Sequence, residues 1–373
     1  MKRHLEIGYR PTWAEVSLGS IEHNIKELRK LILPHTKIMG TVKADAYGHG
    51  LIPVAKRLLT CGVDYFGVAS IDEGIKLRKE GIRLPILVLG MVLKEDIAPL
   101  FEYELTPTVC TLEMATFLNQ KALNRKQKLN LHVKVDTGMA RIGVRHEDAF
   151  ALVKKICRMK FLNIEGIYTH FAFADMSKEF TDMQIRLFES LAIKLNDAGI
   201  YIPLVHAANS IGVIDYYDGH FNMVRPGIVM YGLSPKDDMG MRLKPALTLK
   251  TKVVFVKRVP KGQGVSYGHI YVTNKSTTIV TLPIGYGDGY PRNLSNLAPV
   301  LIKGRRFLIS GRVCMDQIMV DVGNLAVKVG EEVVLIGSQG KNCVSAEELA
   351  RLSGTIPYEI VCGLGNRVPR IYV

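Results

Sequence analysis

Short apolar runs alternate with longer amphipathic segments through the N-terminal part of the chain. The apolar runs are rich in β-branched residues and predict buried strands, whereas apolar positions spaced three and four residues apart predict helices. We expect strands at 37–42, 64–69, 85–90, 105–110, 129–136, 164–170, 203–207 and 223–231. Helices are expected between most of them, for example at 71–81, 112–123, 146–159 and 180–198. A strand at 12–18 and a helix capped by Ser20 precede this series.

Eight successive strand-then-helix units predict a closed (β/α)8 barrel of the TIM type, with its active site at the carboxyl ends of the strands. An open, doubly wound sheet is the alternative fold. It is disfavoured because no GxGxxG motif follows the first strand, and because eight strands suit closure.

A change of pattern marks a second domain after the polar stretch at 234–240. The chain then carries β-type runs separated by glycine-containing turns, at 247–259, 276–284, 299–309, 317–322 and 331–337. Ser345 followed by Glu348 predicts a capping box at the start of a short helix. We therefore predict a barrel at 13–240 and a mostly β C-terminal domain at 241–373, which a strand from residues 1–12 joins.

Length and charge add two limits. The 373 residues exceed what one hydrophobic core usually supports, and 47% hydrophobic with 23% charged residues is typical of a soluble globular protein. The formal net charge is +14, from 49 basic and 35 acidic residues. The basic residues are scattered and form no nucleic-acid module, so we interpret the excess as a surface that favours small anionic ligands.

Targeting and redox features predict a cytoplasmic protein with no membrane partner. Apolar runs such as 85–93 are too short to span a bilayer, and the start MKRHLEIGYRPTW lacks the apolar centre of a signal peptide. The six cysteines form neither a CxxC pair nor a dense framework, as expected in a reducing compartment. No metal is expected, because the histidines and carboxylates lack ligand spacing such as HExxH.

The candidate chemistry centres on Lys43, where the strand at 37–42 ends within the sequence VKADAYGHG. The strand fixes the base of this lysine, and the following loop opens its tip to a cleft. Other polar residues take corresponding places around later strands: Lys134, Asp136, Arg141, His170, His206 and Arg225. Such side chains converge on one mouth, although any one of them could instead be a buried ion pair or a core histidine.

A lysine in such a mouth can form a Schiff base with an aldehyde, and pyridoxal 5'-phosphate is the aldehyde cofactor whose demands the chain meets. Its phosphate needs backbone N–H groups and hydroxyls. Donors of that kind occur at Asn209 and Ser210, and again at Gly227 and Ile228. For each of these residues a purely structural role stays open at this point.

Several motifs resemble those of bacterial alanine racemases, and the likeness extends along nearly the whole chain. VKADAYGHG resembles the cofactor-lysine motif, VDTGMARIG matches the family's VDTGMxRxG, and MVRPGIVMYG and VCGLGNRVPR resemble further family segments. The resemblance implies a pyridoxal-phosphate-dependent racemase that interconverts L-alanine and D-alanine and provides D-alanine for peptidoglycan. It also implies a homodimer with shared active sites.

The resemblance assigns roles to individual residues. Lys43 would carry the cofactor and act as one base, and Tyr267 from a neighbouring subunit, with His170 as its partner, would be the second. Arg225, oriented by His206, would face the pyridine nitrogen, and because it cannot accept a proton the ring stays a weak electron sink. The phosphate contacts would be Tyr47, Ser210, Gly227, Ile228 and Tyr358, with Asn209 and His170 also expected beside the cofactor.

Substrate binding follows from the same resemblance. Arg141 and the backbone N–H of Met315 would hold the substrate carboxylate. A narrow entrance would be lined by Tyr286, Asp175, Arg292, Arg312 and Tyr358. Lys134 alternates with apolar neighbours and so points inward, where a cationic amine is costly. Similar racemases carry a carbamate on this lysine, and we predict the same here as a hypothesis.

Functions of other classes share the lysine. A barrel-type amino acid decarboxylase should leave the departing carboxylate desolvated and unpaired, which Arg141 argues against. A pyridoxal carrier protein would need neither the β domain nor Tyr267. A racemase of broader or serine specificity stays open as an alternative.

Overall fold

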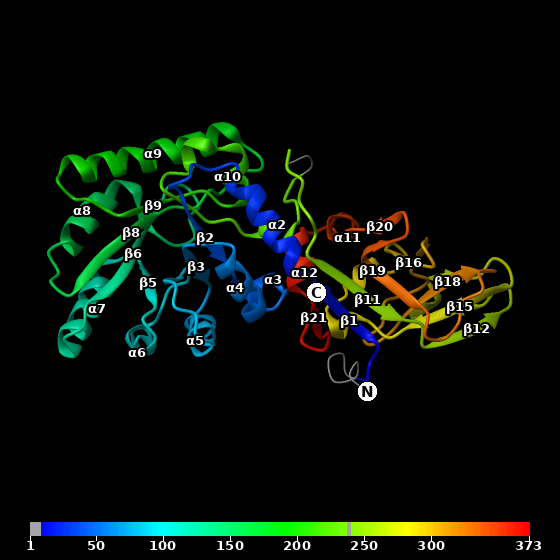
Figure 1. The fold of residues 1–373 in the computed structure, drawn as a ribbon. Coiled ribbons are helices and arrows are strands. Elements are labelled where there is room, and N and C mark those ends of the chain that lie inside the picture. The colour runs from blue at the N-terminus through cyan, green and yellow to red at the C-terminus, as the bar shows by residue number, and fades with distance from the viewer. Residues whose placement is uncertain (1–8, 237–239) are drawn as a thin grey trace.

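Eight parallel strands close into a barrel in the computed structural model, which describes residues 9–236 and 240–373 (Figure 1). In ring order they are β2 (Lys37–Thr41), β3 (Tyr65–Val68), β4 (Ile86–Val88), β5 (Thr106–Val109), β6 (Leu129–Asp136), β8 (Leu162–Tyr168), β9 (Leu204–His206) and β10 (Met223–Val224). The ring closes because β10 pairs with β2 and β5 pairs with β6. The predicted (β/α)8 barrel is confirmed, and the open sheet is excluded.

Helices surround the barrel, and the longer ones each bury one face. In α4 (Leu51–Thr60) the buried face consists of Leu51, Val54, Ala55 and Leu58, at the spacing of one side of a helix. The others are α2 (Leu18–Arg29), α5 (Ile71–Lys79), α6 (Ala98–Glu102), α7 (Leu112–Arg125), α8 (His146–Ile156), α9 (Lys178–Asp197) and α10 (Ser210–Asp215). Short elements between them are α3 (Lys43–Tyr47), η1 (Lys94–Asp96), β7 (Val144–Arg145), η2 (Tyr217–Gly219) and η3 (Ile228–Tyr231).

Two local predictions for the barrel are wrong. Ser17, not Ser20, caps α2, since its hydroxyl accepts the N–H of Ser20 at 3.2 Å. The strand expected at 223–231 ends at Val224, because Pro226 has no N–H to give to a ladder, and η3 follows instead.

The C-terminal part of the chain, from β11 at Leu247 onward, is called the β half below. It is mostly β-structure, as predicted, and lies beside the barrel in Figure 1. Its strands are β11 (Leu247–Lys252), β12 (Phe255–Val259), β13 (Gly264–Val265), β14 (Tyr271–Val272), β15 (Thr277–Leu282), β16 (Pro299–Ile302), β17 (Arg305–Leu308), β18 (Ile318–Gly323), β19 (Glu332–Gln339), β20 (Asn342–Val344) and β21 (Arg370–Tyr372). The remaining elements are η4 (Tyr267–His269), η5 (Tyr286–Asp288), η6 (Arg292–Leu294), α11 (Ala346–Ser353) and α12 (Pro357–Cys362). The runs expected at 247–259 and 299–309 are each divided into two strands.

Strand β1 (Thr12–Val16) belongs to the C-terminal sheet and not to the barrel. It pairs antiparallel with β11 and parallel with β21, so its neighbours come from far along the chain. The predicted barrel start at residue 13 is therefore placed too early. Residues 1–8, expected to join the β domain, and 237–239, in the expected boundary, lie outside the described residues.

The expected capping box at α11 is only half formed. The Ser345 hydroxyl accepts the N–H of Glu348 at 3.1 Å and caps the helix. The Glu348 carboxylate pairs with Arg306 on β17 instead of returning to the N-cap backbone. The ion pair therefore ties α11 to the adjacent hairpin.

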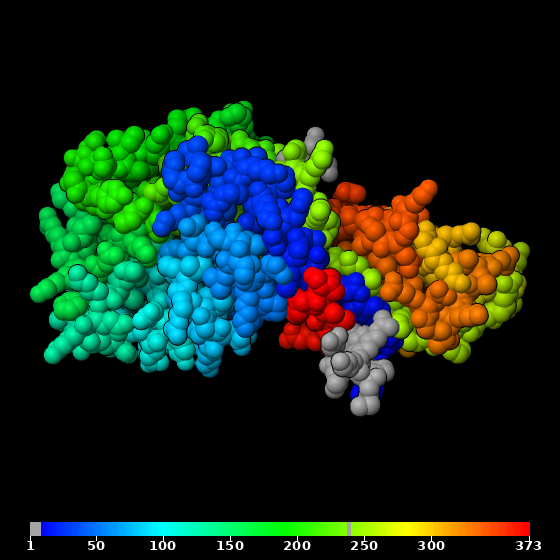
Figure 2. All heavy atoms as spheres, viewed as in Figure 1, coloured from blue at the N-terminus to red at the C-terminus, as the bar shows by residue number. Residues whose placement is uncertain are grey.

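The chain returns to the barrel through α12, and this return completes the barrel mouth. Figure 2 shows N-terminal and C-terminal residues, blue and red, side by side at the junction of the two halves. Gly48, at φ +77°, lies so close to α12 that a Cβ there would be 2.2 Å from the carbonyl oxygen of Val361. Only glycine fits this position, and the fit fixes α12 against the segment that follows Lys43. Within the described ranges, no helix has the length and apolar composition needed to cross a membrane.

Candidate functional site

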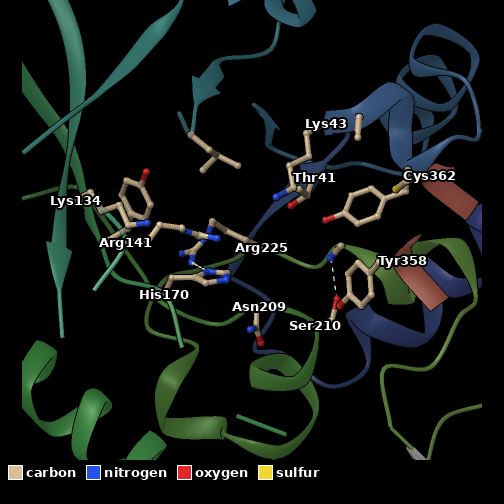
Figure 3. A pocket seen from close by; sticks show the side chains of 15 residues that line it. Thr41, Lys43, Lys134, Arg141, His170, Asn209, Ser210, Arg225, Tyr358 and Cys362 are labelled. Atoms are coloured by element: carbon tan, nitrogen blue, oxygen red, sulfur yellow. Dashed lines mark hydrogen bonds between the residues drawn. The ribbon is translucent and has the colours of Figure 1, made fainter. Parts of the chain in front are cut away.

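The carboxyl ends of the barrel strands enclose a cavity of about 290 Å³ (Figure 3). It contains ten of the predicted site residues: Lys43, Tyr47, Lys134, Arg141, His170, Asn209, Ser210, Arg225, Gly227 and Tyr358. Nine of these come from the barrel and Tyr358 comes from α12, so both halves of the chain build one cavity.

Lys43 is held at the cavity by an unusual backbone turn. The four residues after it, 44–47, all have φ of 53–54°, which is the left-handed helical region, and none is glycine. This conformation costs roughly 1–2 kcal/mol per residue. The Glu73 carboxylate offsets part of that cost by accepting the N–H of Ala44 at 2.6 Å and the N–H of Ala69 at 2.7 Å. The turn thereby fixes the direction from which the lysine enters the cavity.

Among the described residues, the lining carries four cationic side chains, Lys43, Lys134, Arg141 and Arg225, and no carboxylate. Burial lowers the pKa of the Lys43 amine, Arg141 lowers it further, and Glu73 opposes both effects. Burial, followed by the charges of Arg141 and Arg225, lowers the pKa of Lys134 to about 8. Such a cavity attracts anions and makes a neutral, nucleophilic amine easier to form.

Arg225 is the most firmly held of these cations. Its Nη2 donates to the carbonyls of Thr169 and Ala207 at 2.7 and 2.9 Å and approaches His170 Nδ1 at 3.3 Å. Its Nη1 donates to His206 Nδ1 at 2.8 Å. His206 is fully buried behind Arg225 and does not line the cavity, which is the arrangement expected of a residue that orients the arginine. Burial lowers the pKa of His170 well below its ordinary value, so its ring is neutral.

One end of the cavity presents neutral hydrogen-bonding groups. The Ser210 hydroxyl accepts the N–H of Gly227 at 2.9 Å, and a Cβ on Gly227 would lie 2.6 Å from the Tyr47 hydroxyl. Burial raises the pKa of Tyr47, and it raises the pKa of Tyr358 to about 12, so both phenols keep their protons and can donate. Ile228 is fully buried in η3 and does not line the cavity with its side chain.

Tyr267 and Met315 lie elsewhere, in a second, more open cavity of about 780 Å³ on the β half. Their side chains are 71% and 53% exposed, and neither lines the Lys43 cavity. The N–H of Met315 forms no hydrogen bond within the described part of the chain, whereas its carbonyl accepts the N–H of Gly287. A single chain therefore does not bring these two residues to Lys43.

Of the five predicted entrance residues, Tyr358 lines the Lys43 cavity and the other four lie outside it. Asp175 is exposed. Burial is the main cause of the raised pKa of Tyr358, and the nearby charge of Asp175 raises that pKa further. Arg312 is half-buried, and the Cβ position of Gly268, beside Tyr267, is 3.5 Å from its Nε. Tyr286 and Arg292 are exposed on the β half. Only Asp175 and Tyr358 are thus placed together at the barrel mouth.

Five lining residues were not predicted: Thr41, Ala44, Leu89, Tyr168 and Cys362. A signal existed for two of them. Cys362 follows Tyr358 by four residues on α12 and so shares its helical face. Tyr168 is two residues before His170 and therefore points to the same side of an extended chain. The contact of Glu73 with the Lys43 turn has no signature in the sequence.

Comparison with known proteins gives consistent matches over nearly the whole chain. Residues 16–235 match the family model described as alanine racemase, N-terminal domain, and residues 246–372 match alanine racemase, C-terminal domain. The chain is 49% identical to an alanine racemase of Halothermothrix orenii, with 97% of each chain covered. Its structure is similar to that of an alanine racemase of Clostridium difficile 630, with a TM-score of 0.92, 42% identity, and 97% and 96% of the two chains covered. It is also similar to the Bacillus anthracis alanine racemase with bound L-Ala-P, with a TM-score of 0.91, 39% identity, and coverage of 98% and 95%.

Proposed function

The chain belongs to the alanine racemase family, and on that premise we propose that it interconverts L-alanine and D-alanine with pyridoxal 5'-phosphate bound in the Lys43 cavity. The observation that carries the proposal is the composition of that cavity. Its described lining residues combine a lysine of lowered pKa with three further cations and include no carboxylate. An anionic cofactor and an amino acid carboxylate together would balance this charge.

The residues present fit the cofactor. Gly227, Ser210 and the two phenols Tyr47 and Tyr358 would hold the phosphate, since a Cβ at Gly227 would fill the space beside Tyr47. Asn209 also lines this end of the cavity. Lys43 would hold pyridoxal phosphate until the amine of an amino acid takes its place. The cofactor would then withdraw electrons from the α-carbon of that amino acid and make its proton removable.

Arg225 would face the ring nitrogen. Burial lowers the pKa of Arg225 to about 10, which still leaves the guanidinium charged near neutral pH. A charged guanidinium donates and cannot accept, so it would keep the ring nitrogen unprotonated. This weak electron sink favours prompt return of the proton to the α-carbon over side reactions, as racemisation requires.

Proton transfer needs a base on each face of the α-carbon. Lys43 Nζ would serve one face, helped by the lowered pKa of its amine. For the other face we propose Tyr267 of the partner subunit, with His170 as its hydrogen-bond partner, in a homodimer whose two active sites each draw on both chains. The exposure of Tyr267, and its distance from the Lys43 cavity of its own chain, support that assignment.

Arg141 and the N–H of Met315 from the partner subunit, which has no hydrogen-bond partner in the described part of its own chain, would bind the substrate carboxylate. We also propose a carbamate on Lys134. Its amine has no carboxylate in contact within the described residues, yet it lies near Arg141 and Arg225, and a carbamate would replace a third positive charge with a negative one. Intact-protein mass spectrometry in bicarbonate, with Lys134→Met as the control, should show one added carbon dioxide only in the unaltered chain.

The decisive assay incubates the purified protein and pyridoxal phosphate with L-alanine and follows optical rotation and released gas. Racemisation abolishes the rotation without gas, whereas a decarboxylase releases carbon dioxide. Parallel incubations with L-serine and other L-amino acids measure substrate breadth.

We further propose a cytoplasmic role in supplying D-alanine for peptidoglycan, which growth rescue of a D-alanine-requiring bacterium would test.

A further inference from the structure

We propose that Glu165 and His132 are positioning residues that hold Arg225 in place through His206, by a chain of polar contacts across the barrel interior. The inference rests on the proposed function, because Arg225 matters through its place beside the cofactor ring. It adds two residues of the barrel core that touch neither cofactor nor substrate.

The four residues lie on four adjoining strands or strand ends of the barrel. Arg225 Nη1 lies 2.8 Å from His206 Nδ1, and His206 Nε2 lies 2.9 Å from His132 Nδ1. His132 Nε2 then lies 3.8 Å from a carboxylate oxygen of Glu165. Both imidazoles are fully buried, so water does not compete for these contacts.

The positions of the protons on the two histidines follow from the groups at the two ends of this series of contacts, Arg225 and Glu165. A guanidinium only donates hydrogen bonds, so His206 Nδ1 must accept and its proton must be on Nε2. That N–H donates to His132 Nδ1, which places the second proton on His132 Nε2, facing Glu165. A carboxylate only accepts, so both ends favour the same tautomer of both rings. Burial lowers the pKa of each histidine, in agreement with two neutral rings.

Glu165 is itself fixed at the far end. The Tyr65 hydroxyl donates to its Oε2 at 2.8 Å. Burial raises the pKa of Glu165, but its contacts with His132 and Tyr65 outweigh burial and lower the pKa overall, so the group is a carboxylate near neutral pH. His132 Nε2 has no hydrogen-bond partner within the described residues, which leaves this charge as the group that stabilises its N–H.

The consequence concerns Arg225. Without an acceptor at position 165, the buried N–H of His132 faces nothing, and the opposite tautomer relieves it. That tautomer places a proton on His206 Nδ1, against the guanidinium, and breaks the 2.8 Å contact. Arg225 then loses one of its hydrogen-bond partners, and its guanidinium can take more than one position beside the ring nitrogen.

The test uses three variants of the holoenzyme that disturb the same end of the barrel. Glu165→Leu removes the acceptor, Glu165→Gln keeps a neutral one, and Tyr65→Phe removes the hydroxyl while leaving the carboxylate. We expect Glu165→Leu to lower kcat about tenfold with KM changed less than about twofold, because the carboxylate site at Arg141 is untouched. Glu165→Gln should recover kcat to within about threefold and Tyr65→Phe to within about twofold of the unaltered enzyme.

The second readout is independent of catalysis. In ¹⁵N-histidine-labelled holoenzyme, His132 and His206 should each show a protonated Nε2 and an unprotonated Nδ1, with His132→Gln used for assignment. A protonated Nδ1 on His206, or equal losses in Glu165→Leu and Glu165→Gln, would overturn the proposal. If the unaltered protein does not racemise alanine, the proposed function is wrong. The observed histidine tautomers would still show whether Glu165, His132, His206 and Arg225 form the proposed series of contacts.

Discussion

The Lys43 cavity and the Tyr267 cavity differ in how completely they are built. The Lys43 cavity is enclosed, cationic and fixed by buried contacts around Arg225 and by the strained turn after Lys43. The cavity at Tyr267 is larger and open, and its tyrosine projects into solvent. Under the proposed function, the first cavity is one half of a catalytic site, and the second would complete it from another chain. The proposal thus separates cofactor binding, for which one chain would supply the residues, from the second proton transfer, which a pair of chains would complete.

The largest effect is expected from a substitution in the Lys43 cavity. Lys43→Ala removes both the anchor for the cofactor and one base, so racemisation should fall by at least about 10⁴-fold. The unaltered protein should develop visible absorbance with pyridoxal phosphate, and borohydride should then label position 43. A colourless protein, or a label elsewhere, would contradict the assignment of this cavity.

Tyr267→Phe removes the proposed base from the open cavity. It should lower the rate of racemisation roughly 10²–10⁴-fold, the usual contribution of one general acid or base. The loss should be unequal. Proton removal from L-alanine should slow much more than removal from D-alanine, as measured by exchange of the α-proton with deuterated solvent. Equal slowing from both enantiomers would argue against one base on each face.

Mixing the two variants tests whether the halves come from different chains. A hybrid dimer of Lys43→Ala and Tyr267→Phe contains one site with both residues intact and one with neither. Random exchange of subunits should therefore restore about one quarter of the unaltered activity. Lys43→Ala mixed with a chain carrying both substitutions is the matched control and should remain inactive. If the mixture stays inactive although hybrids form, the site is not shared.

The same contrast explains what the sequence could and could not predict. The barrel and its convergent polar residues are visible because strand ends of a closed parallel sheet must meet at one mouth, which places Lys43 with His170 and Arg225. The return of α12 to that mouth depends on the pairing of β1 with β21, which no local pattern encodes. The contacts of Glu73 and Glu165 are likewise long-range, since each carboxylate meets groups on other elements. In the sequence, only the family resemblance points to the proposed role of Tyr267.

Lys134 provides a smaller, pH-dependent test of the cationic cavity. Its pKa is about 8 in the folded chain against an ordinary 10.5, so the unfolded state binds more protons between these values. Stability should therefore rise with pH over that window, by roughly 1–2 kcal/mol from pH 8 to pH 10. Lys134→Met should lack this rise in urea unfolding carried out without carbon dioxide.

Lys155→Met, on the exposed side of α8, is the control for Lys134 and should follow the unaltered protein at both pH values. Adding bicarbonate should stabilise the unaltered protein near pH 8 but not Lys134→Met, because a carbamate removes the buried positive charge. An identical pH dependence in the unaltered protein and Lys134→Met would mean that the amine is not desolvated in solution.

The smallest effect concerns how each cavity positions its reactive residue. Around Tyr267, Gly268 takes one positive-φ position at +68°, although Ser266 and His269 also have positive φ. The turn after Lys43 differs because all four of its consecutive left-handed residues are non-glycine. Ala44 is exposed and has φ 53°, so Ala44→Gly should raise the free energy of unfolding by about 1 kcal/mol. The matched control, Ala151→Gly on the exposed face of right-handed α8, should instead lower it by about 0.5–1 kcal/mol. If both substitutions destabilise equally, the turn stores no strain, and the rigidity of Lys43 must come from the Glu73 contacts and the packing of α12 alone.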